Sequence, residues 1–208
     1  MGIYKDSILT ILYSLLNRPY ITSSLREMSH PLLIHISDTP EFVYPFIFRL
    51  VEQLRPEVLI HTGDMFDEIK LEDRPKEIKE YSSKLKKIMN RLEQLPVKQI
   101  FLIPGNHDNT EVIMDLSRKI VVLPEKSRIE LEGLSLFLSH KYYDQKVDTD
   151  FYLFGHSLPE INRLDIETKL LNGIPCINFI SLSTGTTYTL NYPLGTDSTR
   201  MMLPKIGI

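Results

Sequence analysis

The sequence has a single cysteine, Cys176, among its 208 residues. One thiol excludes an intramolecular disulfide framework and a metal cluster built on several thiolates, and it fits a reducing compartment. The sequence also lacks an apolar run of the roughly 20 residues that a membrane-spanning helix needs. The first residues lack the pattern of a secretory signal, in which a basic segment precedes an apolar segment and a small-residue cleavage site. These absences predict a cytoplasmic protein without a membrane anchor.

No excess of charge of one sign is present either. The formal net charge is −3, from 24 Lys and Arg against 27 Asp and Glu. This balance gives no general attraction to nucleic acid or to an anionic membrane, although a locally basic groove is compatible with it. Hydrophobic residues make up 42% and charged residues 25% of the chain, as in globular proteins. The length suits one domain, residues 1–208, with a sizeable core.

Apolar residues at helical spacing predict an amphipathic helix over residues 4–17. Its apolar stripe consists of Ile8, Ile11, Leu12, Leu15 and Leu16. We expect residues 1–30 to form a helical extension that packs on the domain through this stripe. The alternatives are a helix that binds a membrane surface or a partner. Similar patterns predict further helices over 41–54, 75–95 and about 110–117.

Short apolar runs predict the strands. Those over 31–36, 58–62 and 99–103 alternate with the predicted helices, which is typical of a parallel or mixed sheet with helix cover. Little helical pattern separates the next four, over 119–123, 128–132, 134–139 and 150–154, and a last apolar run at 174–182 precedes a tail of strand and loop. The sequence therefore predicts an α/β fold of two packed mixed β-sheets flanked by helices. Pairing in the second half is expected to be largely antiparallel.

Five of the predicted strands end in residue types that bind metals. In one of them, Asn106, His107 and Asp108 directly follow Gly105. An amide, an imidazole and a carboxylate together at the end of a buried strand are costly unless something polar lies beside them. Ligands of open α/β sheets bind at the carboxyl ends of the strands. We therefore interpret the five strand ends as one site.

The motifs at these strand ends occur in a recognisable order, which is Asp38-Thr-Pro40, Gly63-Asp64-Met-Phe-Asp67, Gly105-Asn106-His107-Asp108, His140 and Gly155-His156-Ser-Leu158. From about residue 32 to 160 this order resembles the calcineurin-like metallophosphoesterase family. The family's motifs are D-x-H, G-D-x-x-D, G-N-H-[DE], a lone His after a strand, and G-H-x-H. The resemblance implies a four-layer α-β-β-α sandwich. It also implies a metal-dependent phosphoesterase that hydrolyses a phosphomonoester or phosphodiester by attack of a metal-bound water.

The resemblance implies a role for each ligand of a two-metal centre. Asp64 bridges the two ions, Asp38 belongs to one of them, and the shell of the other is completed by Asn106, His140 and His156. Carboxylate, amide and neutral imidazole suit borderline-to-hard ions, so we expect Mn²⁺, or else Fe²⁺, Zn²⁺ or Ni²⁺. Two ions of this kind acidify a bound water and offset the charge of a phosphate ester.

The same resemblance implies that His107 lies beside the substrate. There it binds the phosphate or protonates the leaving group, and Asp108 orients His107 or steadies the loop. The expected substrate is a small phosphate ester or a nucleotide. Nucleic acid is possible but has no support from the charge, and the sequence leaves the oligomeric state open. Arg200 in the tail is a further candidate for a phosphate contact, on its charge alone.

Two positions depart from the family pattern. Pro40 stands where D-x-H has its histidine, and Leu158 stands where G-H-x-H has its second histidine. In the family both imidazoles serve the same ion, so we expect one well-held ion and a second that is weak or absent. Nearby candidates to replace them are Glu41, Asp67, Ser157 and Glu160. The alternative to an enzyme is a catalytically impaired pseudo-phosphoesterase that acts as a binding or scaffold module.

Two other histidines, His35 and His61, lie inside predicted strands, each three residues before a motif aspartate. Side chains alternate between the two faces of a strand, so a separation of three points His35 away from the face of Asp38. We expect both to be core histidines that form hydrogen bonds within the sheet.

Overall fold

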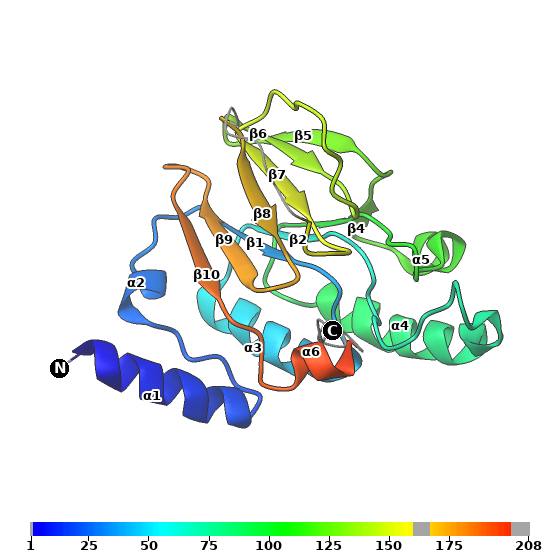
Figure 1. The fold of residues 1–208 in the computed structure, drawn as a ribbon, viewed down its shortest axis with the longest axis horizontal. Coiled ribbons are helices and arrows are strands. Elements are labelled where there is room, and N and C mark those ends of the chain that lie inside the picture. Colours follow the sequence, from blue (N-terminus) through cyan, green and yellow to red (C-terminus); the bar gives the residue numbers. More distant parts are fainter. Residues whose placement is uncertain (1, 160–166, 201–208) are drawn as a thin grey trace, which may run out of the picture.

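A computed structural model of the chain describes residues 2–159 and 167–200. Within these residues the strands form two sheets (Figure 1). The six-stranded sheet contains, in spatial order, β10 (Thr187–Leu190), β9 (Ile177–Ser181), β1 (Leu32–Ile36), β2 (Val58–His61), β3 (Gln99–Leu102) and β4 (Ile120–Val122). The four-stranded sheet contains β5 (Ser127–Leu131), β6 (Leu134–Leu138), β7 (Phe151–Phe154) and β8 (Lys169–Asn172).

The helices of the described residues lie mostly between the strands of the first half of the chain. They are α1 (Gly2–Leu15), α2 (Ser23–Arg26), the 3₁₀ helix η1 (Glu41–Val43), α3 (Tyr44–Leu54), the 3₁₀ helix η2 (Pro75–Glu77), α4 (Ile78–Leu92), α5 (Thr110–Leu116) and α6 (Thr196–Thr199). Figure 1 shows α3 and α4 on the outer side of the six-stranded sheet, away from the four-stranded sheet. None of the described helices is long and apolar enough to cross a bilayer.

Both sheets are mixed, which confirms the predicted fold class. Strands β1 to β4 pair in parallel, and β9 is antiparallel to β1 and to β10. For the four-stranded sheet of the second half, the expectation of largely antiparallel pairing is wrong, because β6, β7 and β8 pair in parallel and within this sheet only β5 is antiparallel to its neighbour. Parallel neighbours need long crossover connections, and the segment after β6, residues 139–150, provides one without the helical periodicity that would reveal a crossover in the sequence.

Alternation of side chains along the strands produces three apolar layers. On β1, Leu32, Ile34 and Ile36 belong to the layer between the sheet and its helices, whereas Leu33 belongs to the layer between the two sheets. On β7, Phe151 and Leu153 face the six-stranded sheet. The opposite face of β7 packs against the connection between β6 and β7, through Tyr142, Val147, Tyr152 and Phe154. The two sheets therefore share an apolar interface, which fixes the ends of their strands relative to one another.

Helix α1 contacts the rest of the chain with the face opposite to its predicted apolar stripe. Ser14 Oγ accepts a hydrogen bond of 2.9 Å from the Leu194 N–H, and Tyr13 makes an edge contact with Tyr20. The five residues of the stripe are 50–69% exposed. The expected packing through this stripe is therefore wrong: the polar face of the helix, with its hydroxyl and tyrosine side chains, is the one that finds partners.

Candidate metal centre

The predicted site residues follow the carboxyl ends of five strands. Because β1, β2 and β3 are parallel neighbours, the loops that follow them lie at the same edge of the six-stranded sheet. These loops carry Asp38, Asp64 and Asn106, while the ends of β6 and β7 bring His140 and His156 to the same place. The interpretation of the strand ends as one site thus has a geometric basis.

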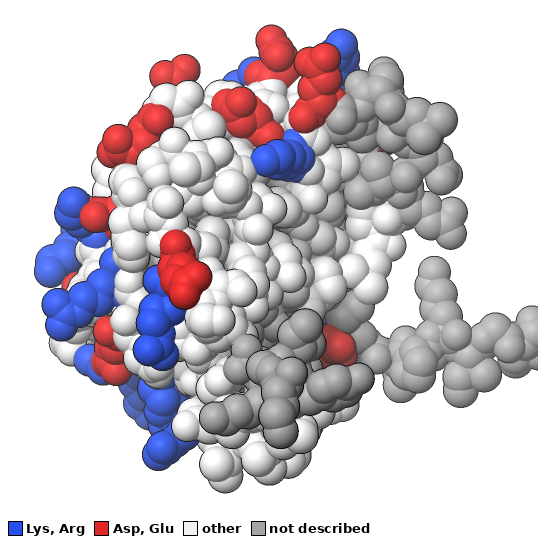
Figure 2. Space-filling model, turned by 90° about the vertical axis from the view of Figure 1, so that its left-hand side faces the viewer, with Lys and Arg blue, Asp and Glu red and all other residues white. Residues whose placement is uncertain are grey.

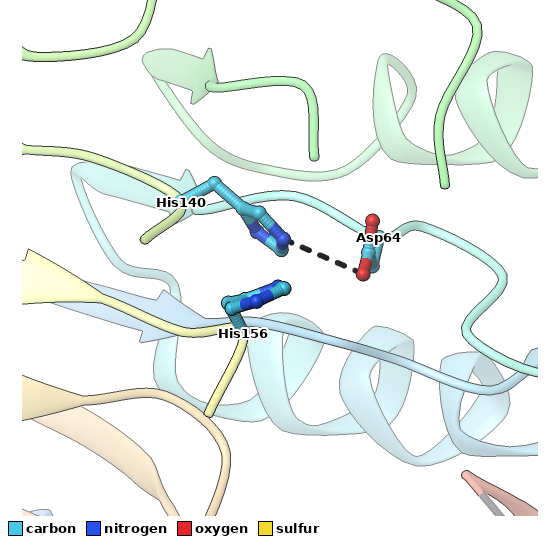
Figure 3. Close-up of side chains that lie close together, drawn as sticks. All are labelled: Asp64, His140 and His156. Carbon is cyan, nitrogen blue, oxygen red and sulfur yellow. Dashed lines mark ion pairs between the residues drawn. The ribbon is translucent and has the colours of Figure 1, made fainter. Parts of the chain in front are cut away.

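Asp64, His140 and His156 form the centre of the site (Figure 3). Their ligand atoms lie within 4.8 Å of one another, and the His140 Nε2 to Asp64 Oδ2 distance is 3.4 Å. The two imidazole rings meet edge to face, with 5.0 Å between their centroids. Asn106 Oδ1 lies 3.0 Å from His140 Nε2. One carboxylate, one amide oxygen and two imidazoles therefore converge, and they belong to the four residues that the family resemblance assigns to the better-held ion.

The orientation of His140 is set by its other ring nitrogen. Nδ1 lies 2.7 Å from the carbonyl oxygen of Thr62, which only accepts, so Nδ1 carries the hydrogen. Nε2 is then left facing two acceptor oxygens, from Asp64 and Asn106. A lone pair facing two oxygens is unfavourable without a cation between them. Burial lowers the pKa of His140, but the Asp64 carboxylate outweighs this effect and raises the pKa to about 9. The centre thus binds either a proton or a metal ion, and its donors fit a divalent ion.

The loops after β2 and β3 are joined through Asp108. Its carboxylate accepts hydrogen bonds from the backbone N–H groups of Asp64 (2.8 Å), Met65 (3.0 Å) and Gly105 (2.9 Å), and from the Tyr81 hydroxyl (2.9 Å). Burial raises the pKa of Asp108 to about 6, although the hydrogen bonds from Gly105, Met65 and Tyr81 lower it. The four bonds fix the backbone on which Asp64 and Asn106 stand.

Asp38 is buried beside this centre. Its Oδ2 accepts hydrogen bonds from Ser37 Oγ (2.6 Å) and from the His156 N–H (3.0 Å). Burial, followed by the charge of Asp64, raises the pKa of Asp38 above its usual range. Asp38 and Asp64 both have left-handed backbones, with φ of 50° and 55°. For residues other than glycine this conformation costs roughly 1–2 kcal/mol, and such strain is concentrated at functional sites.

Arg200 supports the loop that carries Asp38 and does not face a substrate. The residue is 2% exposed, and its guanidinium donates to the carbonyl oxygens of Asp38 (2.5 Å), Ser37 (3.1 Å) and Ile174 (2.7 Å). The expected phosphate contact is therefore wrong. The N–H groups of the guanidinium are used by backbone carbonyl groups, and the positive charge is buried within the protein.

His107 borders the centre, and its side chain is 15% exposed. Its backbone N–H donates to Asp64 Oδ1 over 2.9 Å, and burial lowers the pKa of its imidazole. A ring nitrogen of His107 also forms a second group with carboxylate oxygens of Asp64 and Asp67, again within 4.8 Å of one another. Asp67, one of the four candidates to replace the missing histidines, therefore does reach the centre. Burial raises its pKa to about 7, although an ion pair with Lys70 opposes that rise.

The other candidates are placed less favourably. Glu41 forms an ion pair with Lys84 over 2.9 Å, Ser157 is exposed, and Glu160 lies outside the described residues. Leu158 is 60% exposed, and Pro40 is buried at the start of η1. Neither side chain offers an atom that ligates a metal.

Several residues around the centre carry no signal in the sequence. Glu125 accepts hydrogen bonds from the N–H groups of His140 (2.7 Å) and Lys141 (3.1 Å), and Glu72 accepts one from Asn106 Nδ2 (2.7 Å). Both are glutamates on loops, remote in sequence from their partners. Only the position of the loops in the folded chain gives them their partners, so no local pattern identifies them.

His35 and His61 are core histidines, as predicted. His35 bonds Thr62 Oγ1 (2.9 Å) and accepts from Asn178 Nδ2 (3.1 Å). His61 Nδ1 accepts from the Gly63 N–H (3.1 Å), and its Nε2 lies 2.7 Å from Thr39 Oγ1. Burial lowers the pKa of both to about 3, so both are neutral in the folded chain.

The chain is thus an α/β protein with two mixed sheets. At the ends of its strands, a carboxylate, an amide and imidazoles form a candidate metal-binding site. The model of one family, the calcineurin-like phosphoesterases, matches residues 32–191. The chain therefore belongs to the calcineurin-like phosphoesterase family, as the order of its motifs predicted.

Solved structures resemble the chain at low sequence identity. One of them shares 12% identity over 78% of this chain and 99% of that chain, with a TM-score of 0.56, which shows the fold alone. Yfce, a phosphoesterase from E. coli, shares 16% identity over 77% of this chain and 100% of its own, with a TM-score of 0.49. The Pseudomonas putida nuclease MPE shares 19% sequence identity over 76% of this chain and 87% of its own, with a TM-score of 0.44. No curated protein matches the chain.

Proposed function

We propose that the protein hydrolyses a phosphomonoester or phosphodiester with one well-held divalent ion, Mn²⁺ or else Fe²⁺, Zn²⁺ or Ni²⁺. Membership of the calcineurin-like phosphoesterases supports a metal-dependent phosphoesterase in general. The observation that carries the proposal is the orientation of His140. Its Nδ1–H is fixed on the Thr62 carbonyl, and its Nε2 faces Asp64 and Asn106.

Asp64, Asn106, His140 and His156 are the residues that would hold this ion, and Asp38 lies next to them, bonded to the His156 N–H. When bound, a divalent ion acidifies a coordinated water and offsets charge on the phosphoryl oxygens. The chain itself orients the ligands. The Thr62 carbonyl fixes the ring of His140, and Asp108 fixes the backbone of Asp64. Such fixation of ligands typically contributes 10–100-fold to metal affinity or activity.

His107 is the proposed group at the substrate. Its backbone N–H donates to Asp64 Oδ1, and a ring nitrogen lies within 4.8 Å of carboxylate oxygens of Asp64 and Asp67, a position that suits binding of the phosphate or protonation of the leaving oxygen. We propose that Asp108 contributes by steadying the loop, since its four hydrogen bonds go to backbone N–H groups and to Tyr81.

The test is hydrolysis of an aryl phosphate and of a bis-aryl phosphodiester with added Mn²⁺. Activity should be present in the native chain and should fall by about 10²-fold or more in His107→Ala, the usual range for a lost acid–base group. His30→Ala, at an exposed position before β1, is the matched control and should keep full activity. A native protein that is inert with every metal and both ester types would refute the proposed function.

The second candidate is a catalytically impaired pseudo-phosphoesterase that acts as a binding or scaffold module. It is favoured by Pro40 and Leu158, which remove two imidazoles from one side of the centre. If a missing second ion limits activity, Pro40→His together with Leu158→His should raise the rate of ester hydrolysis. An unchanged rate in this double variant would show that the two departures do not limit the enzyme.

The proposed substrate is a small phosphate ester or a nucleotide. On the side seen in Figure 2, basic and acidic side chains border a largely uncharged centre, so this face offers no single-sign surface for a nucleic acid. The net charge of −3 gives no support in that direction either. We also propose a cytoplasmic location, because the single cysteine, Cys176, is a free thiol.

A further inference from the structure

Lys70 lies beside the half of the centre that has lost its imidazoles. Its ammonium group forms an ion pair with the carboxylate of Asp67. An oxygen of Asp67, in turn, lies within 4.8 Å of a ligand atom of Asp64 and of a ring nitrogen of His107. The side chain of Lys70 is 20% exposed, whereas that of Asp67 is 6% exposed. A cation therefore stands at the edge of the centre, next to the proposed substrate-binding imidazole.

The turn that carries Lys70 is attached to the loop that carries Pro40. The Glu41 N–H donates to both carboxylate oxygens of Glu68, over 3.0 and 3.2 Å. Glu41 directly follows Pro40, and Glu68 lies between Asp67 and Lys70 in the chain. The ion pair is thus fixed against the segment where the family pattern has its histidine and this chain has proline.

We propose that the ammonium group of Lys70 takes the place of the second divalent ion and binds a non-bridging oxygen of the substrate phosphate. The inference rests on the proposed function, because it assigns a residue to the same site. An ammonium has three N–H donors, and its ion pair with Asp67 uses one, so two remain for an anion. Lys70 acts as a compact positive charge, a common way of binding phosphate.

The charges of the centre support this assignment. Asp38 and Asp64 each affect the pKa of Asp67, so the three carboxylates share one electrostatic environment. One divalent ion at Asp64, Asn106, His140 and His156, together with one ammonium, carries as much positive charge as these three carboxylates carry negative charge. A second divalent ion would find Asp67 already paired with Lys70, and on the side chains of Pro40 and Leu158 it would find no ligand atom.

The test is the affinity of the full chain for inorganic phosphate at saturating Mn²⁺, measured by isothermal titration calorimetry. Lys70→Met keeps most of the side-chain length and removes the charge, and it should weaken phosphate binding by about tenfold or more. Lys70→Arg keeps the charge and should lose less phosphate affinity than Lys70→Met. Lys98→Met is the matched control, because Lys98 directly precedes β3 at the opposite edge of the sheet and its side chain is 79% exposed. It should bind phosphate like the native protein.

Equal phosphate affinity of the native protein and Lys70→Met would overturn the inference, as would a native protein that binds no phosphate. Thermal unfolding of each variant shows whether a loss of binding comes from a loss of folding, and Lys70→Arg provides a second folded comparison. Phosphate binding requires no turnover. A chain that binds phosphate through Lys70 but hydrolyses no ester would therefore refute the proposed function and leave this inference standing. An active enzyme whose phosphate affinity is independent of Lys70 would support the proposed function and refute this inference.

Discussion

The missing side chains of glycines determine how closely the loops of the centre approach one another. A Cβ atom on Gly105 would lie 2.2 Å from Asp64 Oδ1, and one on Gly155 would lie 1.9 Å from Ser37 Oγ and 2.3 Å from Asp38 Oδ2. Contacts this short do not occur between non-bonded atoms. Gly105 is therefore required by the carboxylate of Asp64, and Gly155 by that of Asp38. Each motif therefore depends on residues that lie far away in the sequence.

Gly155→Ala should displace Asp38 and the neighbouring backbone of His156, at a cost of about 1–3 kcal/mol of unfolding free energy, as in other overpacked interiors. Its Mn²⁺ affinity should fall as well, because His156 is a proposed ligand. Gly133→Ala is the control: Gly133 has a left-handed φ of 83° but open space around it, so only stability should change, by about 1 kcal/mol. Urea unfolding and Mn²⁺ titration measure the two effects. Native Mn²⁺ affinity in Gly155→Ala would contradict this role.

The buried imidazoles predict how stability depends on pH. The pKa of His35 and of His61 is lowered by burial from 6.5 to about 3. Between pH 6.5 and pH 3 the unfolded chain binds protons that the folded chain does not, so stability is lost as the pH falls through this window. Each group contributes up to about 1.4 kcal/mol per pH unit there. His35→Gln should therefore reduce the slope of unfolding free energy against pH, measured on the metal-free protein. An unchanged slope would show that His35 titrates in the folded chain.

At the scale of the secondary-structure elements, Asp108 connects the loop after β2, the loop after β3 and helix α4, which carries Tyr81. Asp108→Asn replaces a carboxylate that accepts four hydrogen bonds by an amide, whose oxygen can accept two of them while its NH₂ group faces the other two donors. We expect a loss of about 3 kcal/mol, because charged hydrogen bonds are broken and backbone donors are left unpaired. Tyr81→Phe removes one of the four bonds and should cost about 1 kcal/mol. Urea unfolding compares the two variants, and equal losses would contradict the connecting role.

Local patterns predicted most elements of the first half of the chain. Runs such as Leu32–Ile36 and Val58–His61 are apolar, bounded by breakers and followed by motif residues, so both their type and their ends are visible. The pairing of β6, β7 and β8 was not predictable in this way. Parallel and antiparallel strands that are buried on both faces look alike in sequence, and the connection after β6 has no helical periodicity.

The candidate ligands of the centre carry a signal in the sequence, and the residues that support them do not. The residue types of Asp64, Asn106, His140 and His156 already indicate metal ligation. Arg200 was assigned to the substrate because its charge is visible in the sequence, whereas the three carbonyl groups that it binds are not. The same reason hides Lys70, Glu72 and Glu125: their roles come from partners that only the fold brings near.

At the scale of the whole molecule, residues 8–15, the part of α1 whose side chains the structure describes, contribute little apolar burial although the sequence is amphipathic. Leu16, which directly follows α1, is 69% exposed, whereas Leu25 in α2 is 1% exposed. We therefore expect Leu16→Ala to change the unfolding free energy by less than about 0.5 kcal/mol, and Leu25→Ala to reduce it by about 2–5 kcal/mol. Urea unfolding of the two variants tests this difference. A large loss in Leu16→Ala would show that the stripe is covered in solution.

We also propose that the chain is one domain, because the layer between the two sheets joins strands from both halves of the sequence. Strands β1, β2 and β3 contribute to this layer from one side, and β6 and β7 from the other. The centre lies where the ends of the two sets of strands meet, so its geometry depends on both sheets. Thermal unfolding of the protein should then show a single cooperative transition.

The count of tightly bound metal ions tests the central claim most directly. Metal-free protein titrated with Mn²⁺ should bind one ion per chain with high affinity, and His140→Ala, which removes the imidazole between Asp64 and Asn106, should lose that ion. The exposed His30→Ala variant should keep it. A native chain that binds no ion tightly, two ions equally tightly, or one ion that survives in His140→Ala would contradict the account.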